Sequence, residues 1–221
     1  MGAAHKTSNS EQQKAWIWLE LSTLYNSVTN YSLLQFYALA VFNYATDNTL
    51  SNNTWLQDNR TASEYNFGVW NYIDCNCGTD ITALNATNSA LVGSLPPEIG
   101  LLTSLTYLDL SVNDFNGRLP TEIGLLTRLT SLSLYENSFD GTLPTEIGLL
   151  INVTTLGLSG LIFISTVPTE IGLLTSVTNL ALSSNMFNGT VPTEIGHLTS
   201  HTSLYLHENS FDGTLARRLD Y

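Results

Sequence analysis

Basic residues are scarce in this sequence, and charged residues of any kind are few. The chain contains 7 Lys and Arg residues against 19 Asp and Glu, which gives a formal charge of −12, and only 12% of its residues are charged. A nucleic-acid binder needs a basic stripe that displaces counterions from phosphates, and an anionic membrane surface repels an acidic protein. The composition therefore argues against nucleic acids and anionic membranes as partners.

Cysteines and long apolar runs are also lacking. Cys75 and Cys77 are the only cysteines; they cannot build a multi-bridge framework, and their spacing disfavours a bridge between them, so the redox compartment stays open. The stretch Met1 to Gln13 is polar and shows no secretory signal. Tyr31 to Ala45 is apolar but interrupted by Gln35, and it is too short to cross a bilayer. We expect no transmembrane span and, if the protein is exported, a missing, unusual or internal signal.

Glycine, proline and tryptophan are unevenly distributed along the chain. No glycine occurs between Gly2 and Gly68, all four tryptophans precede residue 71, and all six prolines follow residue 95. This shift near residue 80 indicates a change of architecture. We predict a disordered N-terminus over residues 1–9, a helical and aromatic N-terminal cap over 10–80, and a solenoid over 81–221 that lacks a C-terminal cap.

Two helices are expected in the cap. Ser10 and Gln13 fit a capping box ahead of the first, and apolar residues then recur at helical spacing, at Ile17, Leu21, Leu24 and Val28. The second helix is predicted from about Tyr31 to Thr46. We expect one of its faces to be apolar and to consist of Leu34, Ala38, Val41 and Ala45.

The second half of the chain is an internal repeat. A Pro-x-Glu-Ile-Gly run occurs five times at a step of 24 residues, with its prolines at Pro96, Pro120, Pro144, Pro168 and Pro192. A fixed period of this length marks a solenoid in which each repeat packs on its neighbours. Alternating leucines such as Leu108 and Leu110 predict a short strand in every coil, with both side chains facing inward.

The repeat resembles the plant-type, 24-residue leucine-rich repeat. The motif runs Leu105-x-x-Leu108-x-Leu110-x-x-Asn113-x-Phe115-x-Gly117-x-Leu119-Pro120 and recurs in phase. The resemblance implies an α/β solenoid of about six coils with a curved parallel sheet. It also implies that the asparagines bond the backbone of neighbouring turns and that the protein acts like receptor-like ectodomains or polygalacturonase-inhibiting proteins. Such proteins are extracellular or at the cell surface, so the resemblance also implies a receptor-like, membrane-associated glycoprotein.

Two coils depart from the pattern. In the fourth coil, Leu161 stands in place of Asn and Ser165 in place of Gly. We interpret this as drift with a hydrophobic residue in the amide position, the alternative being a distortion that opens a binding notch. The sixth coil begins with His201 at an inward position and does not complete the motif. An uncovered sheet edge pairs readily with other chains, which leads to the hypothesis of a partial solenoid or of self-association through the C-terminal edge.

Candidate binding residues lie on the concave strand face, the usual binding surface of a solenoid. Tyrosine offers a large contact at low entropic cost, so we predict two patches around tyrosines, the alternative for each residue being an ordinary solvated face. The first patch comprises Tyr107, Asp109, Tyr135 and Glu136, and the second comprises Tyr205, His207 and Glu208.

Regular polar columns offer further hypotheses. Thr82, Thr106, Thr130, Thr154, Thr178 and Thr202 form one threonine column, and Thr121, Thr145, Thr169 and Thr193 form another. Such rows resemble the flat surfaces of some ice-binding solenoids, although duplication alone also copies them. The glutamate column from Glu98 to Glu194 is favoured as a solvated row, because hard cations need converging oxygens. Sequons permit glycosylation at Asn30, Asn52, Asn59, Asn85, Asn152 and Asn188.

Motifs for catalysis are missing from the sequence. No nucleophile elbow, phosphate loop or kinase signature is present, and the histidines lack metal-ligand spacing. We therefore predict a non-enzymatic module without cofactor or metal that binds a protein, peptide or glycan. The alternative is a structural or surface-active secreted protein, which includes ice binding.

Overall fold

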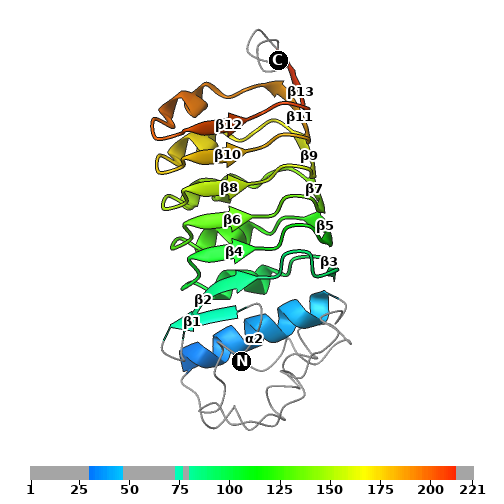
Figure 1. Cartoon of the computed structure of the whole chain (residues 1–221), viewed down its shortest axis with the longest axis vertical. Helices are drawn as coiled ribbons and strands as arrows, with labels where there is room; N and C mark the ends of the chain where they lie inside the picture. Colours follow the sequence, from blue (N-terminus) through cyan, green and yellow to red (C-terminus); the bar gives the residue numbers. More distant parts are fainter. Residues whose placement is uncertain (1–29, 47–72, 77–79, 213–221) are drawn as a thin grey trace.

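The computed structural model describes residues 30–46, 73–76 and 80–212. Figure 1 shows a solenoid whose coils stack along one axis, with helix α2 at the end near the N-terminus. Each full coil contributes one strand to a main sheet, one strand to a second sheet and a short 3-10 helix. The leucine-rich-repeat solenoid expected from the sequence is confirmed.

The main sheet is parallel except at its first strand. Its order is β1-β2-β4-β6-β8-β10-β12, and β1 pairs antiparallel with β2. Leu108 lies opposite Leu84 and Leu132, so the register advances by one repeat at every strand. The bounds are Ile73–Asn76 (β1), Asp80–Asn85 (β2), Tyr107–Asp109 (β4), Ser131–Ser133 (β6), Thr155–Gly157 (β8), Asn179–Ala181 (β10) and Ser203–Tyr205 (β12).

A second parallel sheet, which the sequence analysis did not predict, runs along one side of the solenoid (Figure 1). We call it the side sheet. In three of its strands polar residues flank an inward phenylalanine, as in Asp114-Phe115-Asn116, and this period of two is typical of a half-buried strand. The bounds are Val92–Gly93 (β3), Asp114–Arg118 (β5), Ser138–Gly141 (β7), Ile162–Ser165 (β9), Met186–Thr190 (β11) and Ser210–Asp212 (β13).

The Pro-x-Glu-Ile-Gly runs form the 3-10 helices. Each begins after an extended proline; Pro120, for example, has φ −67° and ψ 141°, a conformation that the proline ring favours. The helices pack so closely that a Cβ atom on Gly172 would lie 2.5 Å from the carbonyl oxygen of Glu194. The bounds are Pro97–Leu101 (η4), Thr121–Leu125 (η5), Thr145–Leu149 (η6), Thr169–Leu173 (η7) and Thr193–His197 (η8).

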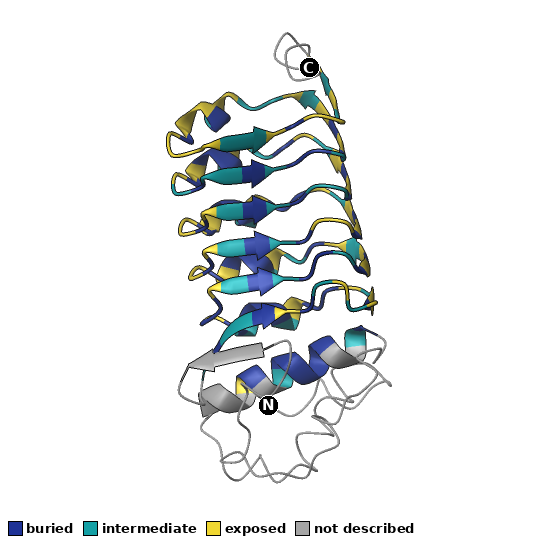
Figure 2. Ribbon diagram, viewed as in Figure 1, coloured by how far each residue is buried: buried dark blue, intermediate teal, exposed yellow. Residues whose placement is uncertain are grey.

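The core is a column of buried aliphatic and phenylalanine residues inside the coils. Figure 2 shows the buried stretches of each coil in dark blue. The Phe115 and Phe139 rings stack with centroids 5.7 Å apart, and Phe163 and Phe187 lie 5.9 Å apart. In the described part of the chain, no ring contact joins Phe139 to Phe163. The aromatic stack is therefore interrupted between the third and fourth coils.

An asparagine ladder, made of Asn113, Asn137, Asn185 and Asn209, bonds coil to coil. The Asn137 amide nitrogen donates to the backbone oxygens of Leu110 and Leu134, each at 3.0 Å. Its oxygen accepts from the Phe115 N–H at 3.0 Å. The predicted inward asparagines thus form the expected bonds. Leu161 is buried at the equivalent position, and because its side chain has no polar atom, the ladder skips the junction between the third and fourth coils.

Ser165 adopts the backbone conformation that glycine holds in the other coils. Its φ is +76°, close to the values of +71° at Gly117 and +73° at Gly141. This left-handed region is costly for residues with a Cβ atom. The fourth coil therefore keeps the path of the repeat at the expense of local strain.

Helix α2 (Asn30–Ala45) closes the end of the solenoid beside β2 and η4. Phe42 lies 6.0 Å from Phe115 between ring centroids. The helix confirms the predicted element from about Tyr31 to Thr46, and Ala38 and Val41 are buried as expected. Leu34 is exposed, so its prediction as a core residue was wrong. Gln35 is 1% exposed instead, because its side chain bonds the first coil. The first predicted helix lies outside the described residues.

Candidate functional site

The concave sheet carries the predicted binding residues in two groups. Tyr107 and Asp109 lie in β4, while Tyr135 and Glu136 lie two and three residues beyond the end of β6. Tyr205 lies in β12, and His207 and Glu208 follow it. Because strands are spaced about 4.8 Å apart, three steps separate β6 from β12 by roughly 14 Å. The structure therefore places the first group on the middle strands of this face and the second at its C-terminal edge.

Asp109 organises the first group. Its carboxylate accepts hydrogen bonds from the Tyr107 hydroxyl at 3.1 Å, from the Ser111 backbone N–H at 3.0 Å, and from the Ser111 hydroxyl. Burial raises the pKa of the Tyr107 hydroxyl, and the charge of Asp109 and the neighbouring Tyr135 raise it further. The Tyr107 ring is thereby held beside a fixed carboxylate, while Tyr135 is exposed.

The second group pairs an aromatic contact with a carboxylate. The Tyr205 and His207 rings meet edge to face, with centroids 6.4 Å apart. The Ser184 hydroxyl donates to a Glu208 carboxylate oxygen. Tyr205 is exposed, so its ring is available to a ligand while its neighbours limit its orientation.

Small side chains separate the two groups. Gly157 lies in β8 and Ala181 in β10, and the hydroxyls of Ser159 and Ser183 bond each other at 2.9 Å. Gly160 has φ +67°, and the non-glycine residues Val112 and Glu136 adopt similar positive angles at the equivalent position. A glycine there relieves strain instead of opening a notch. The strands between the two groups, β8 and β10, therefore present small or polar side chains on the concave face.

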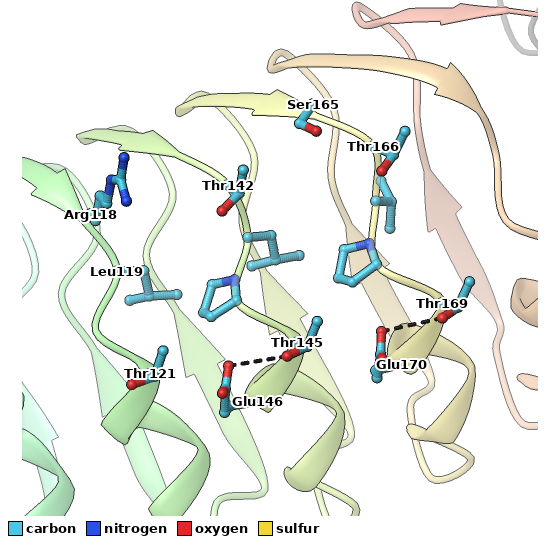
Figure 3. Close-up of a pocket in the computed structure, with 14 residues that line it drawn as sticks. Arg118, Leu119, Thr121, Thr142, Thr145, Glu146, Ser165, Thr166, Thr169 and Glu170 are labelled. Atoms are coloured by element: carbon cyan, nitrogen blue, oxygen red, sulfur yellow. Dashed lines mark hydrogen bonds between the residues drawn. The ribbon is translucent and has the colours of Figure 1, made fainter.

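A hollow of about 590 Å³ lies on the side of the solenoid, between the side sheet and the 3-10 helices (Figure 3). Sequence analysis did not identify it, because it forms where residues of three successive coils meet. Arg118 lies at one end of it, and Thr142 and Thr166 lie above the row of Thr145 and Thr169.

The two threonine columns differ in their hydrogen bonds. Hydroxyls of the first column donate along the solenoid, as from Thr130 to the Thr106 carbonyl at 2.9 Å. Hydroxyls of the second column donate to the next residue, as from Thr145 to Glu146 at 3.3 Å. The second column is exposed, and its members Thr121, Thr145 and Thr169 border the hollow. The carboxylates of the glutamate column from Glu122 to Glu194 accept these bonds. In the described residues, no group of three potential ligands is placed to hold a metal ion.

The sequons lie in different environments. Asn85, Asn152 and Asn188 are exposed, and the Asn152 amide donates to the Thr127 carbonyl at 2.8 Å. Asn30 begins α2, whereas Asn52 and Asn59 lie outside the described residues. Cys75 lies in β1, and Cys77 lies outside the described part. Among the described helices, none has the length and hydropathy that a membrane crossing needs.

Comparison with known proteins agrees with this architecture. The Leucine Rich Repeat family model matches residues 104–126 and 128–150, and no curated protein matches in sequence. The complex of BIR3 and SERK2 from Arabidopsis thaliana contains a similar chain, with 28% identity over 65% of this chain and 77% of that chain and a TM-score of 0.58.

Two further structures cover more of this chain. A plant ice-binding protein shares 26% identity over 84% of this chain and 58% of its own, with a TM-score of 0.72. The Arabidopsis receptor kinase HAESA, solved with the peptide hormone IDA and the co-receptor SERK1, shares 25% identity over 84% of this chain and 30% of its own, with a TM-score of 0.71. The repeat motif and the coil geometry make the chain a leucine-rich-repeat solenoid, and these similarities support a plant-type leucine-rich-repeat protein.

Proposed function

We propose that this protein is a non-enzymatic binding module that recognises a protein, peptide or glycan on its concave face, in a receptor-like or inhibitor-like role. The observation that carries the proposal is the pair of tyrosine and carboxylate groups, one on the middle strands of that face and one at its C-terminal edge. Tyr107 and Asp109 belong to the first group, and Tyr205 and Glu208 belong to the second. Aromatic anchors separated by small residues suit an elongated ligand, which buries its own side chains against the small residues of β8 and β10 between the anchors.

A peptide or protein is the favoured ligand. HAESA was solved with a peptide hormone and a co-receptor, and BIR3 was solved with SERK2. The acidic surface of this chain, with its formal charge of −12, favours a basic partner through electrostatic complementarity. We place the protein outside the cell or at its surface on the same similarity, with glycosylation at the exposed sequons Asn85, Asn152 and Asn188.

Partner capture from the native source tests the concave site. Immobilised wild-type protein is compared with a Tyr107→Ala/Tyr135→Ala variant and with Arg128→Ala, which changes an exposed residue in the turn that precedes β6. We expect a specific partner to be retained by the wild type and by Arg128→Ala and to be lost from the double variant. Equal capture by all three proteins would refute the concave site.

Ice binding is the second candidate, favoured by the similarity to the plant ice-binding protein. The exposed threonines Thr121, Thr145, Thr169 and Thr193 supply a regular row on a face other than the concave one. Thermal hysteresis and ice recrystallisation are measured for the wild type, for Thr145→Tyr/Thr169→Tyr and for Tyr107→Ala. Activity that is lost only in the threonine variant supports this function, and ordinary ice growth with the wild type rejects it.

A further inference from the structure

The fourth coil exposes apolar side chains on the side sheet. Ile162 and Ile164 point outward from β9 and are 43% and 45% exposed. Met186, in the next strand β11, lies opposite Ile164 in the sheet register and is 54% exposed. These three residues form one surface, which we call the isoleucine patch.

The other coils are mostly polar at the same outward positions. Asp114, Ser138 and Ser210 occupy the position of Ile162, and Asn116, Asp140, Asn188 and Asp212 occupy that of Ile164. Both outward positions of β9 are thus apolar in the fourth coil, whereas β5, β7 and β13 have none. Because copying of a repeat unit reproduces polar residues at these positions, the patch is a specific departure from the repeat.

Packing within the solenoid accounts for the exposed leucines of the 3-10 helices but not for the patch. In the first coil, Val92 at the position of Ile164 is also exposed, at 38%. Leu125 and Leu149 are also exposed, but they recur at every 24th residue and cover the preceding coil. A Cβ atom on Gly100 would lie 3.1 Å from Leu125 Cδ1, and one on Gly124 would lie 3.1 Å from Leu149 Cδ1. These leucines fill space between coils, whereas the isoleucines belong to one strand only.

The charges around the patch indicate what covers it. Asp140 lies opposite Ile162 in the register of β7 and β9, and Asp114 and Asp212 are exposed on the same sheet. Arg118 is the one cationic side chain among the described strands of the side sheet. A second copy of this chain would bring two acidic rims together, which electrostatic repulsion disfavours.

We propose that the isoleucine patch is a docking surface for a second protein, whose contact segment carries apolar residues flanked by Lys or Arg. The apolar side chains bury Ile162, Ile164 and Met186, and the basic flanks face Asp140 and its neighbours. This arrangement has an apolar centre and a polar rim, as in specific interfaces. The surface lies on a different sheet from the concave site, so the protein can hold two partners at once.

The test uses a defined probe and a variant that restores the repeat. The probe is a capped peptide of alternating Lys and Leu, compared with Lys–Ser and Glu–Leu peptides of the same length. The variant, Ile162→Ser/Ile164→Asn, copies the residues at Ser138 and Asn116 and leaves the net charge unchanged. Binding is measured by isothermal titration calorimetry at two salt concentrations, and circular dichroism confirms that the variant is folded.

We expect the wild type to bind the Lys–Leu peptide at least about tenfold more tightly than the variant does. The Lys–Ser and Glu–Leu peptides should bind the wild type no more tightly than the Lys–Leu peptide binds the variant. Added salt should weaken the complex of the wild type with the Lys–Leu peptide. Equal affinity of wild type and variant would overturn the proposal, and so would equal binding of the Glu–Leu peptide. A wild-type dimer in sedimentation equilibrium that the variant lacks would instead assign the patch to a second copy and would also overturn it.

Discussion

The side-chain oxygen of Gln35 accepts a hydrogen bond from the backbone N–H of Ile81 at 2.7 Å, although the two residues are 46 positions apart. Both are buried. Gln35 therefore gives the first coil an amide hydrogen bond of the kind that the asparagine ladder makes between coils. The glutamine that interrupts an apolar helix in the sequence is the contact that joins this helix to the solenoid.

Replacement of Gln35 by Leu should destabilise the protein. The Ile81 N–H would remain buried without its acceptor, which costs about 1–3 kcal/mol in the free energy of unfolding. Urea denaturation followed by circular dichroism measures the loss. Asn116→Ala, at an exposed position, is the control and should change stability by less than about 0.5 kcal/mol. A Gln35→Leu protein as stable as this control would contradict the role assigned to the bond.

Two glycines at equivalent repeat positions should respond in opposite ways to alanine. At Gly172 a Cβ atom would lie 2.5 Å from the Glu194 carbonyl oxygen, whereas at Gly196 no described atom lies within 4 Å. Gly172→Ala should cost about 1–3 kcal/mol because the backbone must shift. Gly196→Ala should leave stability unchanged or raise it by less than about 1 kcal/mol. Thermal unfolding of both variants provides the comparison, and similar midpoints would disprove tight packing between η7 and η8.

Ser165→Gly should stabilise the fourth coil. The serine has φ +76°, and release of the left-handed strain is worth about 1 kcal/mol. Ser133→Gly in β6 is the matched control and should lose about 0.5–1 kcal/mol, because its backbone is an ordinary strand. Chemical denaturation of the two variants tests the pair. If both lose stability, Ser165 carries no strain.

Hydrogen exchange should show a weak junction between the third and fourth coils. The amides of Phe115 and Phe187 donate to Asn137 and Asn209 at 3.0 and 3.1 Å. For Phe139 the equivalent acceptor position is occupied by Leu161, whose side chain cannot accept a hydrogen bond. Its amide should exchange about tenfold faster than the other two, as measured by exchange followed by NMR. Equal protection of the three amides would show that another contact compensates for the missing asparagine.

Stability should fall at alkaline pH in part through Tyr107. Burial and Asp109 raise the pKa of its hydroxyl in the folded protein, whereas an unfolded tyrosine titrates near pH 10. The neutral hydroxyl therefore contributes stability that is fully present below about pH 10 and is lost as pH rises through the folded pKa. Tyr107→Phe should make the decline above about pH 10 shallower in urea titrations. A decline as steep as that of the wild type would assign the effect to other groups.

The period of 24 residues predicted most of the architecture, because solenoid packing depends on residues that recur in phase. Leu108 and Asn113 lie where the repeat required. The side sheet was not predicted because its strands are short and contain a single inward residue, Phe115 or its equivalent. One buried phenylalanine per coil is equally compatible with an irregular loop. Leu34 was misassigned because helical spacing alone does not show which face of helix α2 meets the backbone of the first coil. That face buries Gln35, which bonds the Ile81 N–H, and leaves Leu34 exposed. The hollow beside Thr145 depends on three coils at once, and no single repeat encodes it.

The hydroxyl chain through the first threonine column has an evolutionary consequence. Each threonine donates to the threonine carbonyl of the coil before it, from Thr106 to Thr82 and onward to Thr202 and Thr178. A coil thus brings its own donor and offers an acceptor of the same kind. Duplication of 24 codons would add a unit already matched to both neighbours, so the gene can lengthen or shorten in whole coils while the fold is preserved.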